Sequence, residues 1–95
     1  MTEMFYVYII ETDDGTYYTG QTNDLSRRLQ EHISQSSQSA TYFKMHKPLF
    51  LVYLEEFETR GDAMRREIEI KKNQKLKQEL IEDNDRISIE SYLSD

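Results

Sequence analysis

The chain is short, acidic and free of cysteine. Its 95 residues are enough for one domain with a single core, and 37% hydrophobic and 32% charged residues are typical of a soluble globular protein. The lack of cysteine excludes disulfides, zinc–cysteine sites and thiol catalysis, and no apolar run approaches the roughly 20 residues that span a bilayer. We therefore expect a protein of the reducing cytoplasm that does not enter membranes.

Positive charge is concentrated in the middle of the chain. The net charge is −6, but residues 27–54 carry +3 and residues 60–77 carry +4, whereas residues 1–26 and 78–95 carry −5 each. A phosphate responds to the local field rather than to the average charge. The two basic segments therefore allow a polyanionic partner, with weak and strongly salt-sensitive binding.

A β-hairpin is predicted at the start of the chain. Residues 4–11 are rich in aromatic and β-branched types, and residues 16–19 return as a second strand after the turn signal Asp13-Asp14-Gly15. The hairpin defines the first two strands of the fold.

The length of this turn decides which side chains share a face. A two-residue turn pairs Tyr18 with Glu11 and separates Tyr8 from Tyr18. A three-residue loop pairs Tyr18 with Ile10 and Tyr8 with Gly20, so both tyrosines lie on one face. We predict the three-residue loop.

A helix is predicted from about Asp24, capped by Thr22 or Asn23. Its apolar stripe recurs at i, i+4 and i+8: Leu25, Leu29 and Ile33. Arg28 and His32 are also one turn apart, so they form a polar row beside the stripe. The serine-rich segment that follows, residues 34–41, reads as a mobile loop.

In the second half of the chain, the sequence pattern predicts one strand and two helices. A strand over 49–54 follows Pro48, and Thr59 caps a helix that begins at Arg60. The pattern resets near Asn73, where a final helix begins.

These elements give an α+β fold, a three-stranded antiparallel sheet flanked by about three helices in the order ββαβαα. We assign residues 1–82 to the domain and residues 83–95 to an acidic, flexible tail.

The motifs along this pattern resemble the GIY-YIG nuclease superfamily. They are Val7-Tyr8-Ile9, Tyr18-Thr19-Gly20, the run from Asp24 to His32, and Arg65-Arg66-Glu67. The similarity extends from about residue 4 to about residue 80, and it looks closest to the small stand-alone bacterial members. Each motif alone is weak, but the ordered set is specific.

The resemblance implies hydrolysis of a DNA phosphodiester with one divalent metal ion, Mg²⁺ or Mn²⁺. Tyr8 and Tyr18 match the two motif tyrosines, and Arg28 matches the motif arginine. His32 matches the polar partner one turn later, and Glu67 matches the metal-binding acid.

The chain departs from the family pattern at several positions. Val7 replaces the first glycine of the name-giving motif, which is common and chemically silent. Gln21 stands where several active members have a lysine, so a phosphate-binding or proton-relaying charge is missing there. Asn73 is a candidate for the late asparagine of the family. No specificity domain is attached, which suggests low sequence preference or a protein partner that supplies specificity.

Each site residue also has a plain structural interpretation. The two tyrosines fit simple packing on a sheet, and His32 fits a surface or capping residue. Arg28 fits a solvated helix arginine that pairs with Glu31 or Asp24, whereas in the functional interpretation Arg27 points away from the site and serves as a control. Glu67 lies four residues after Ala63, beside an apolar stripe, where a carboxylate is costly unless it is paired or metal-bound. Its structural alternative is an ion pair with Arg28 or Arg65.

A basic stretch surrounds the end of the second helix and offers contacts to a phosphate backbone. The candidate nucleic-acid-binding residues are Arg65, Lys71, Lys72 and Lys75, with Arg66 and Lys77 nearby. The alternative is an ordinary solvated helix face.

The sequence thus predicts a metal-dependent endonuclease with little sequence preference, acting on branched, damaged or single-stranded DNA in repair or recombination. The main alternative is a non-catalytic nucleic-acid-binding module that keeps the fold. A third interpretation is a protein-interaction module that uses exposed tyrosines and the acidic tail.

Overall fold

The computed structural model describes residues 3–34 and 39–94, so residues 35–38 of the predicted serine-rich loop lie outside it. A four-stranded antiparallel sheet forms the centre, in the order β2-β1-β3-β4. Its strands are β1 (Phe5–Thr12), β2 (Tyr17–Thr22), β3 (Pro48–Phe57) and β4 (Ile87–Ser88). The helices are α1 (Leu25–Ser34), α2 (Arg60–Lys72), α3 (Gln74–Asp83) and α4 (Ile89–Leu93), with a 3-10 turn η1 (Thr41–Lys44).

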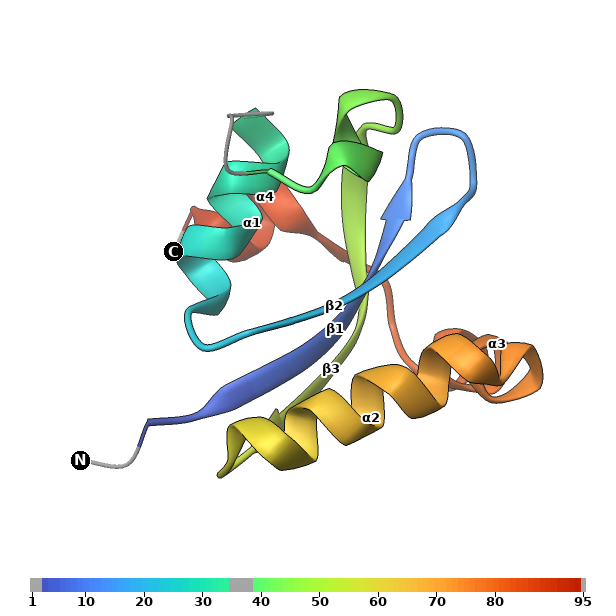
Figure 1. The fold of residues 1–95 in the computed structure, drawn as a ribbon. Coiled ribbons are helices and arrows are strands. Elements are labelled where there is room, and N and C mark those ends of the chain that lie inside the picture. Colours follow the sequence, from blue (N-terminus) through green and yellow to red (C-terminus); the bar gives the residue numbers. More distant parts are fainter. Residues whose placement is uncertain (1–2, 35–38, 95) are drawn as a thin grey trace.

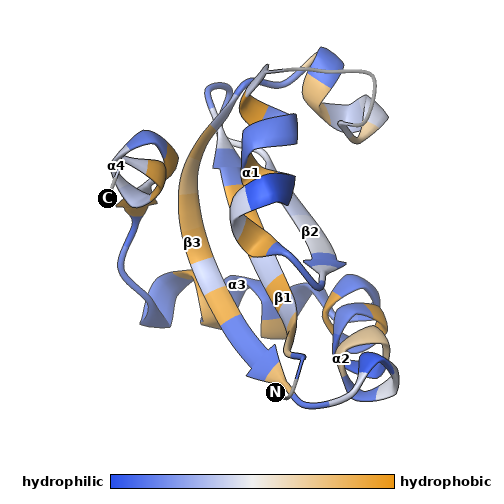
Figure 2. Cartoon of the chain, turned by 90° about the vertical axis from the view of Figure 1, so that its left-hand side faces the viewer, coloured by the Kyte–Doolittle hydropathy of each residue, from blue (hydrophilic) through white to orange (hydrophobic). Residues whose placement is uncertain are grey.

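Helices cover both faces of the sheet (Figure 1). Because side chains alternate along a strand, β1 contributes Val7 and Ile9 to one face and Tyr8 and Ile10 to the other. The first face packs against α2 and α3, and the second packs against α1, η1 and α4. In Figure 2 the hydrophobic colour is concentrated on β1 and β3, whereas the edge strand β2 is pale.

The hairpin has the predicted three-residue loop. Tyr8 pairs with Gly20 and Ile10 pairs with Tyr18. Gly15 has a φ of 79°, in the left-handed region that glycine tolerates, and its N–H donates to the Thr12 carbonyl at 3.1 Å. The register argument is confirmed, and both tyrosines lie on the face that α1 covers.

The helix ends are capped by side chains, as the sequence predicts for α2. Thr59 accepts a hydrogen bond from the Asp62 N–H at 3.1 Å. The cap of α1 is Asp24 rather than Thr22 or Asn23, because its carboxylate accepts from the Arg27 N–H at 3.2 Å.

The sheet is larger than predicted, because the C-terminal segment folds against it. β4 pairs with Phe50 and Leu51 of β3, and Ile89 of α4 is almost completely buried. Arg86 pairs with Glu11 at 3.0 Å, and its guanidinium lies 4.1 Å from the centre of the Phe50 ring. The expected order ββαβαα therefore lacks one strand and one helix, and most of the acidic segment is regular structure.

Among residues 3–34 and 39–94, no helix combines the length and the apolar character that crossing a membrane requires.

Candidate active site

Tyr8 lies at the centre of the predicted site, and its side chain reaches across the neighbouring strand to lie over Gly20. A Cβ atom on Gly20 would stand 2.7 Å from the Tyr8 hydroxyl and 2.9 Å from the Tyr18 ring. Any side chain at this position would therefore collide with both tyrosines. The glycine of the second motif is the residue that lets the two phenol rings come together over β2.

The Tyr8 hydroxyl is held by His32 from α1. The Tyr8 oxygen is 3.0 Å from His32 Nε2, and His32 Nδ1 is 3.4 Å from the hydroxyl of Ser39. Because Ser39 donates its own proton to the Ala40 carbonyl, it accepts from Nδ1–H. Nε2 is then the unprotonated nitrogen, and the Tyr8 phenol donates to it.

His32 is a core residue, which corrects the expectation of a polar row on the helix surface. Its side chain has no exposed area, and its ring lies 4.4 Å from the ring of Phe43. Burial, with a smaller contribution from the Arg28 cation, lowers the pKa of His32 to about 4. The imidazole is therefore neutral near pH 7, as a proton acceptor for Tyr8 must be.

Arg28 lies beside the same phenol. It is near enough to lower the pKa of Tyr8, and its guanidinium pairs with Glu31 at 2.9 Å. The side chain is 28% exposed, whereas that of Arg27 is 65% exposed and pairs with Asp24. Neighbouring arginines thus have different surroundings, and only Arg28 reaches the tyrosine.

Glu67 approaches the site from α2, on the other face of the sheet. α2 packs against β1 and β2 as well as β3, and the Glu67 carboxylate is near enough to raise the pKa of Tyr8. Its side chain is 18% exposed and pairs with Lys71 at 2.9 Å, so the partner is not Arg28 or Arg65. Burial is the main cause of the raised Tyr8 pKa, and it keeps the phenol protonated near neutral pH.

The five predicted site residues group in two layers: His32 contacts the Tyr8 oxygen, and Tyr18, Arg28 and Glu67 are near enough to change the pKa of Tyr8. The inner layer is Tyr8, His32 and Ser39, and all three are buried. The outer layer is Tyr18, Arg28 and Glu67, which are partly exposed.

Aromatic residues from η1 complete the support of the site. Phe43 is buried, and its ring lies 4.8 Å from the ring of Tyr18. The ring of Tyr42 lies 5.6 Å from the same Tyr18 ring. Sequence reasoning did not find Ser39, Tyr42 or Phe43. Ser39 lies in the serine-rich segment, Tyr42 and Phe43 directly follow it, and the segment has no periodicity, so only tertiary contacts identify these residues.

The donor set fits a divalent cation only in a substrate-assisted way. Within the described part of the chain, no group of three or more histidine, cysteine or acidic side chains is placed to hold a metal ion. Among the groups that shift the pKa of Tyr8, Glu67 is the one carboxylate. Mg²⁺ commonly takes one or two protein carboxylates and completes its shell with water and phosphate oxygens. A single glutamate meets that requirement.

The predicted nucleic-acid-binding residues differ in their ion pairs and in their exposure. Arg65 forms a close ion pair with Asp62, and Lys71 is engaged by Glu67. Lys72 and Lys75 are exposed. Asn73 acts as the cap of α3, because its side chain accepts from the Leu76 N–H at 3.0 Å.

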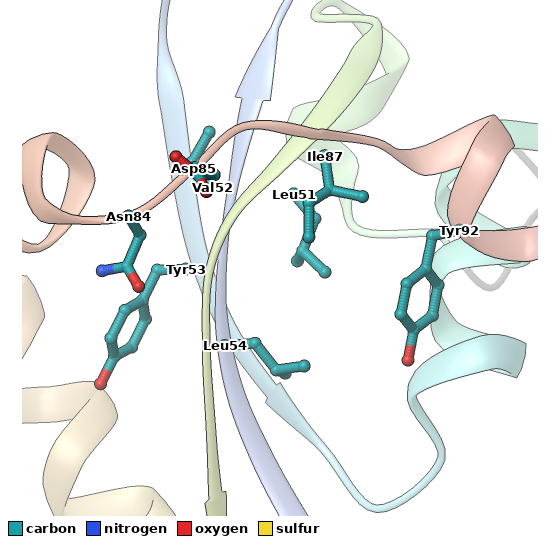
Figure 3. A pocket seen from close by; sticks show the side chains of 8 residues that line it. All are labelled: Leu51, Val52, Tyr53, Leu54, Asn84, Asp85, Ile87 and Tyr92. Carbon is teal, nitrogen blue, oxygen red and sulfur yellow. The ribbon is translucent and has the colours of Figure 1, made fainter.

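A hollow of about 280 Å³ lies at the opposite edge of the sheet, beside β3 and β4 (Figure 3). Apolar side chains form much of its lining, among them Leu51, Leu54 and Ile87, with Tyr92 at one side. None of the five predicted site residues lines it, so it is separate from the candidate active site.

Comparison with known proteins agrees with this arrangement. The sequence matches the family described as the GIY-YIG catalytic domain over residues 4–80. A UPF0213 protein of Halobacterium salinarum is 41% identical over 78 residues, covering 82% of this chain and 99% of that protein. A UPF0213 protein of Staphylococcus saprophyticus is 42% identical over 66 residues, covering 70% of this chain and 78% of that protein.

A solved structure gives the same result. The solution NMR structure of a UPF0213 protein from Bacillus halodurans superposes with a TM-score of 0.51 at 32% identity, and the match covers 83% of each chain. The family match over residues 4–80 includes every motif on which the site is built. The chain belongs to the GIY-YIG family, a family of nuclease-type domains whose substrates are nucleic acids.

Proposed function

We propose that this protein is an endonuclease that hydrolyses DNA phosphodiester bonds with the help of one divalent cation. The observation that carries the proposal is the convergence of four groups on the Tyr8 phenol. His32 accepts the hydrogen bond of the phenol, and Arg28, Tyr18 and Glu67 lie near enough to change the pKa of Tyr8. Simple packing of tyrosines on a sheet requires none of these contacts.

The outer layer is the part that meets the substrate. The Arg28 guanidinium neutralises charge on a non-bridging phosphate oxygen, a role that suits its planar, permanently charged fork. Glu67 would hold a divalent cation, Mg²⁺ or Mn²⁺, which would supply Lewis-acid stabilisation of the phosphoryl charge. Tyr18, which is only half-buried, positions the attacking water.

The inner layer handles the proton of that water. Burial raises the pKa of Tyr8, so the phenol does not ionise by itself near neutral pH. Transfer of the phenol proton to His32 Nε2, as Tyr8 takes a proton from the water, avoids a free phenolate. The Arg28 cation stabilises the charge that develops on the Tyr8 oxygen.

We expect low sequence preference and a substrate with locally accessible strands, such as branched, damaged or single-stranded DNA in repair or recombination. The site lies at the sheet edge β2 and carries no element shaped for reading base edges in a groove. A separate protein that supplies specificity is part of this proposal.

The test is cleavage of a panel of labelled substrates with Mg²⁺ or Mn²⁺: duplex, nicked, branched and single-stranded DNA, and RNA. We expect cleavage of at least one DNA substrate, its loss with a chelator, and its loss in Glu67→Gln. Absence of cleavage of every substrate at any enzyme concentration would contradict the proposal.

The second candidate is a non-catalytic nucleic-acid-binding module. Gln21, which replaces the usual lysine after the second motif, and the net charge of −6 favour it. DNA binding that survives both chelation and Glu67→Gln, without any nicking, would support this module over the enzyme.

A further inference from the structure

A polar hollow of about 220 Å³ lies beside β2, on the hairpin side of the active site. Nearly all of its lining side chains carry hydrogen-bonding groups: Thr16, Tyr17, Tyr42, Gln74, Lys77 and Gln78, with Ile81 as the apolar member. Its volume is below the range of roughly 300–1,000 Å³ that drug-sized ligands occupy. The hollow therefore suits one small polar unit.

Two chains of contacts connect this hollow to the active site. Tyr42 lines the hollow, and its ring lies 5.6 Å from that of Tyr18. On the other side, Lys71 is near enough to lower the pKa of Lys77, and Lys71 pairs with Glu67 at 2.9 Å. Tyr42 thus connects the hollow to Tyr18, and Lys71 lies between Lys77 of the hollow and Glu67.

Lys77 gives the hollow a positive charge without a compensating acid. Its ammonium group donates to the Tyr17 carbonyl at 3.1 Å, and within the described residues no carboxylate lies within ion-pair distance of it. Burial, and then the neighbouring Lys71 cation, lower the pKa of Lys77. Both causes disfavour the charged lysine, and a bound anion would offset them.

The Gln74 amide adds a donor and an acceptor on the same helix. The Gln78 amide nitrogen donates to the Glu82 carboxylate at 3.1 Å, so Gln78 offers its carbonyl oxygen as an acceptor. An amide can donate and accept at once, which matches the edges of a nucleobase, and the phenol ring of Tyr42 offers an aromatic surface. Tyr42 is itself held by stacking on His46, whose ring lies 4.2 Å away.

We propose that this hollow binds the nucleotide next to the cleaved linkage, with its phosphate on Lys77 and its base against Gln74, Gln78 and Tyr42. The proposal rests on the proposed function, because it places this nucleotide on the same strand as the phosphate at Arg28. It also assigns a single-stranded or locally unpaired substrate, since a base paired within a duplex cannot enter the hollow. Lys77 of this subsite supplies a positive charge that the chain lacks at position 21, where it has Gln21.

The test is binding of a fluorescent single-stranded oligothymidylate, measured by anisotropy in the presence of a chelator so that no cutting occurs. Gln74→Glu introduces an acid into the hollow, yet an acid in the first turn suits the helix dipole of α3. Lys77→Gln removes the cation. Lys47→Gln is the matched control, because it removes the same charge, and Lys47 is exposed and does not line the hollow.

We expect Gln74→Glu and Lys77→Gln to weaken binding by about fivefold or more, and Lys47→Gln by less than about twofold. Lys77→Gln should also reduce the slope of log Kd against log salt by about 0.7, the value for one phosphate contact on a single strand. A loss of fold alone would not change that slope selectively. Thermal melts of all three variants check the fold.

The two proposals fail in different ways. If wild-type protein cuts DNA but Gln74→Glu binds like Lys47→Gln, the subsite is wrong and the enzyme stands. If Gln74→Glu and Lys77→Gln weaken binding selectively but no substrate is ever cut, the subsite stands and the nuclease activity is wrong.

Discussion

The two layers of the active site differ in how the protein holds them. Tyr8, His32 and Ser39 form an inner layer, buried and linked by hydrogen bonds that exist without any ligand. Arg28 and Glu67 of the outer layer are partly exposed and pair with Glu31 and Lys71. The inner layer is therefore set by folding, and we expect the outer layer to exchange its partners when a substrate binds.

This difference separates stability from activity. A change in the inner layer disturbs the core as well as the chemistry, because a buried polar group that loses its partner carries its full desolvation cost. A change in the outer layer removes a surface ion pair worth at most about 0.5 kcal/mol. Variants of the two layers should therefore have different signatures.

The largest effect on activity is expected from Glu67→Gln. It should lower kcat by about a thousandfold or more, because the carboxylate that would hold the cation is lost. The melting temperature should change little, since only the Lys71 pair is removed. Glu79→Gln, an exposed change on α3, is the control. Equal kcat values for Glu67→Gln and Glu79→Gln would show that Glu67 is not part of the active site.

Arg28→Ala should follow, with a loss of about a hundredfold or more in kcat through lost charge stabilisation of the phosphate. Arg27→Ala is its matched control, on the same helix but 65% exposed. A cleavage assay on both variants decides the point. Similar losses at the two positions would mean that general positive charge matters, not proximity to the Tyr8 phenol.

Gly20→Ala should affect both layers at once. The added Cβ would stand 2.7 Å from the Tyr8 hydroxyl and 2.9 Å from the Tyr18 ring, so both phenols must shift. We expect a loss of about 1–3 kcal/mol in unfolding free energy and a fall of about tenfold or more in kcat. In Gly61→Ala the nearest atom is 3.5 Å away, and the helix should gain up to about 1 kcal/mol. Chemical denaturation of both variants measures the contrast.

The smallest effect is a pH dependence of stability that arises in the inner layer. The pKa of His32 is lowered to about 4 in the folded protein, so between about pH 6.5 and 4 the unfolded chain binds the extra proton. Stability should therefore fall as pH falls through this window, by at most about 1.4 kcal/mol per pH unit from this group. Denaturation of wild type and His32→Gln tests it. An unchanged slope in the variant would assign the pH dependence to other groups.

Much of this arrangement follows from local sequence. Gly15 fixes the hairpin register, and the register puts Tyr8 and Tyr18 on one face. The spacing of Arg28 and His32 places them on one side of α1, although their burial differs.

The remainder depends on tertiary contacts that no local pattern encodes. His32 looks like a surface residue until Phe43 and Tyr8 enclose it. The two-residue strand β4 is too short for any alternation to be visible, and it forms because Ile89 and Arg86 anchor the segment to the sheet.

The central claim is that both layers act on one phosphate, and a double-mutant cycle tests it most directly. Tyr8→Phe removes the inner hydroxyl, Glu67→Gln removes the outer carboxylate, and kcat is compared among wild type, both single variants and the double variant. Residues that act as one unit give non-additive losses. We predict a double variant no slower than the slower single variant. Losses that multiply would show that Tyr8 and Glu67 act independently and would contradict a single two-layered site.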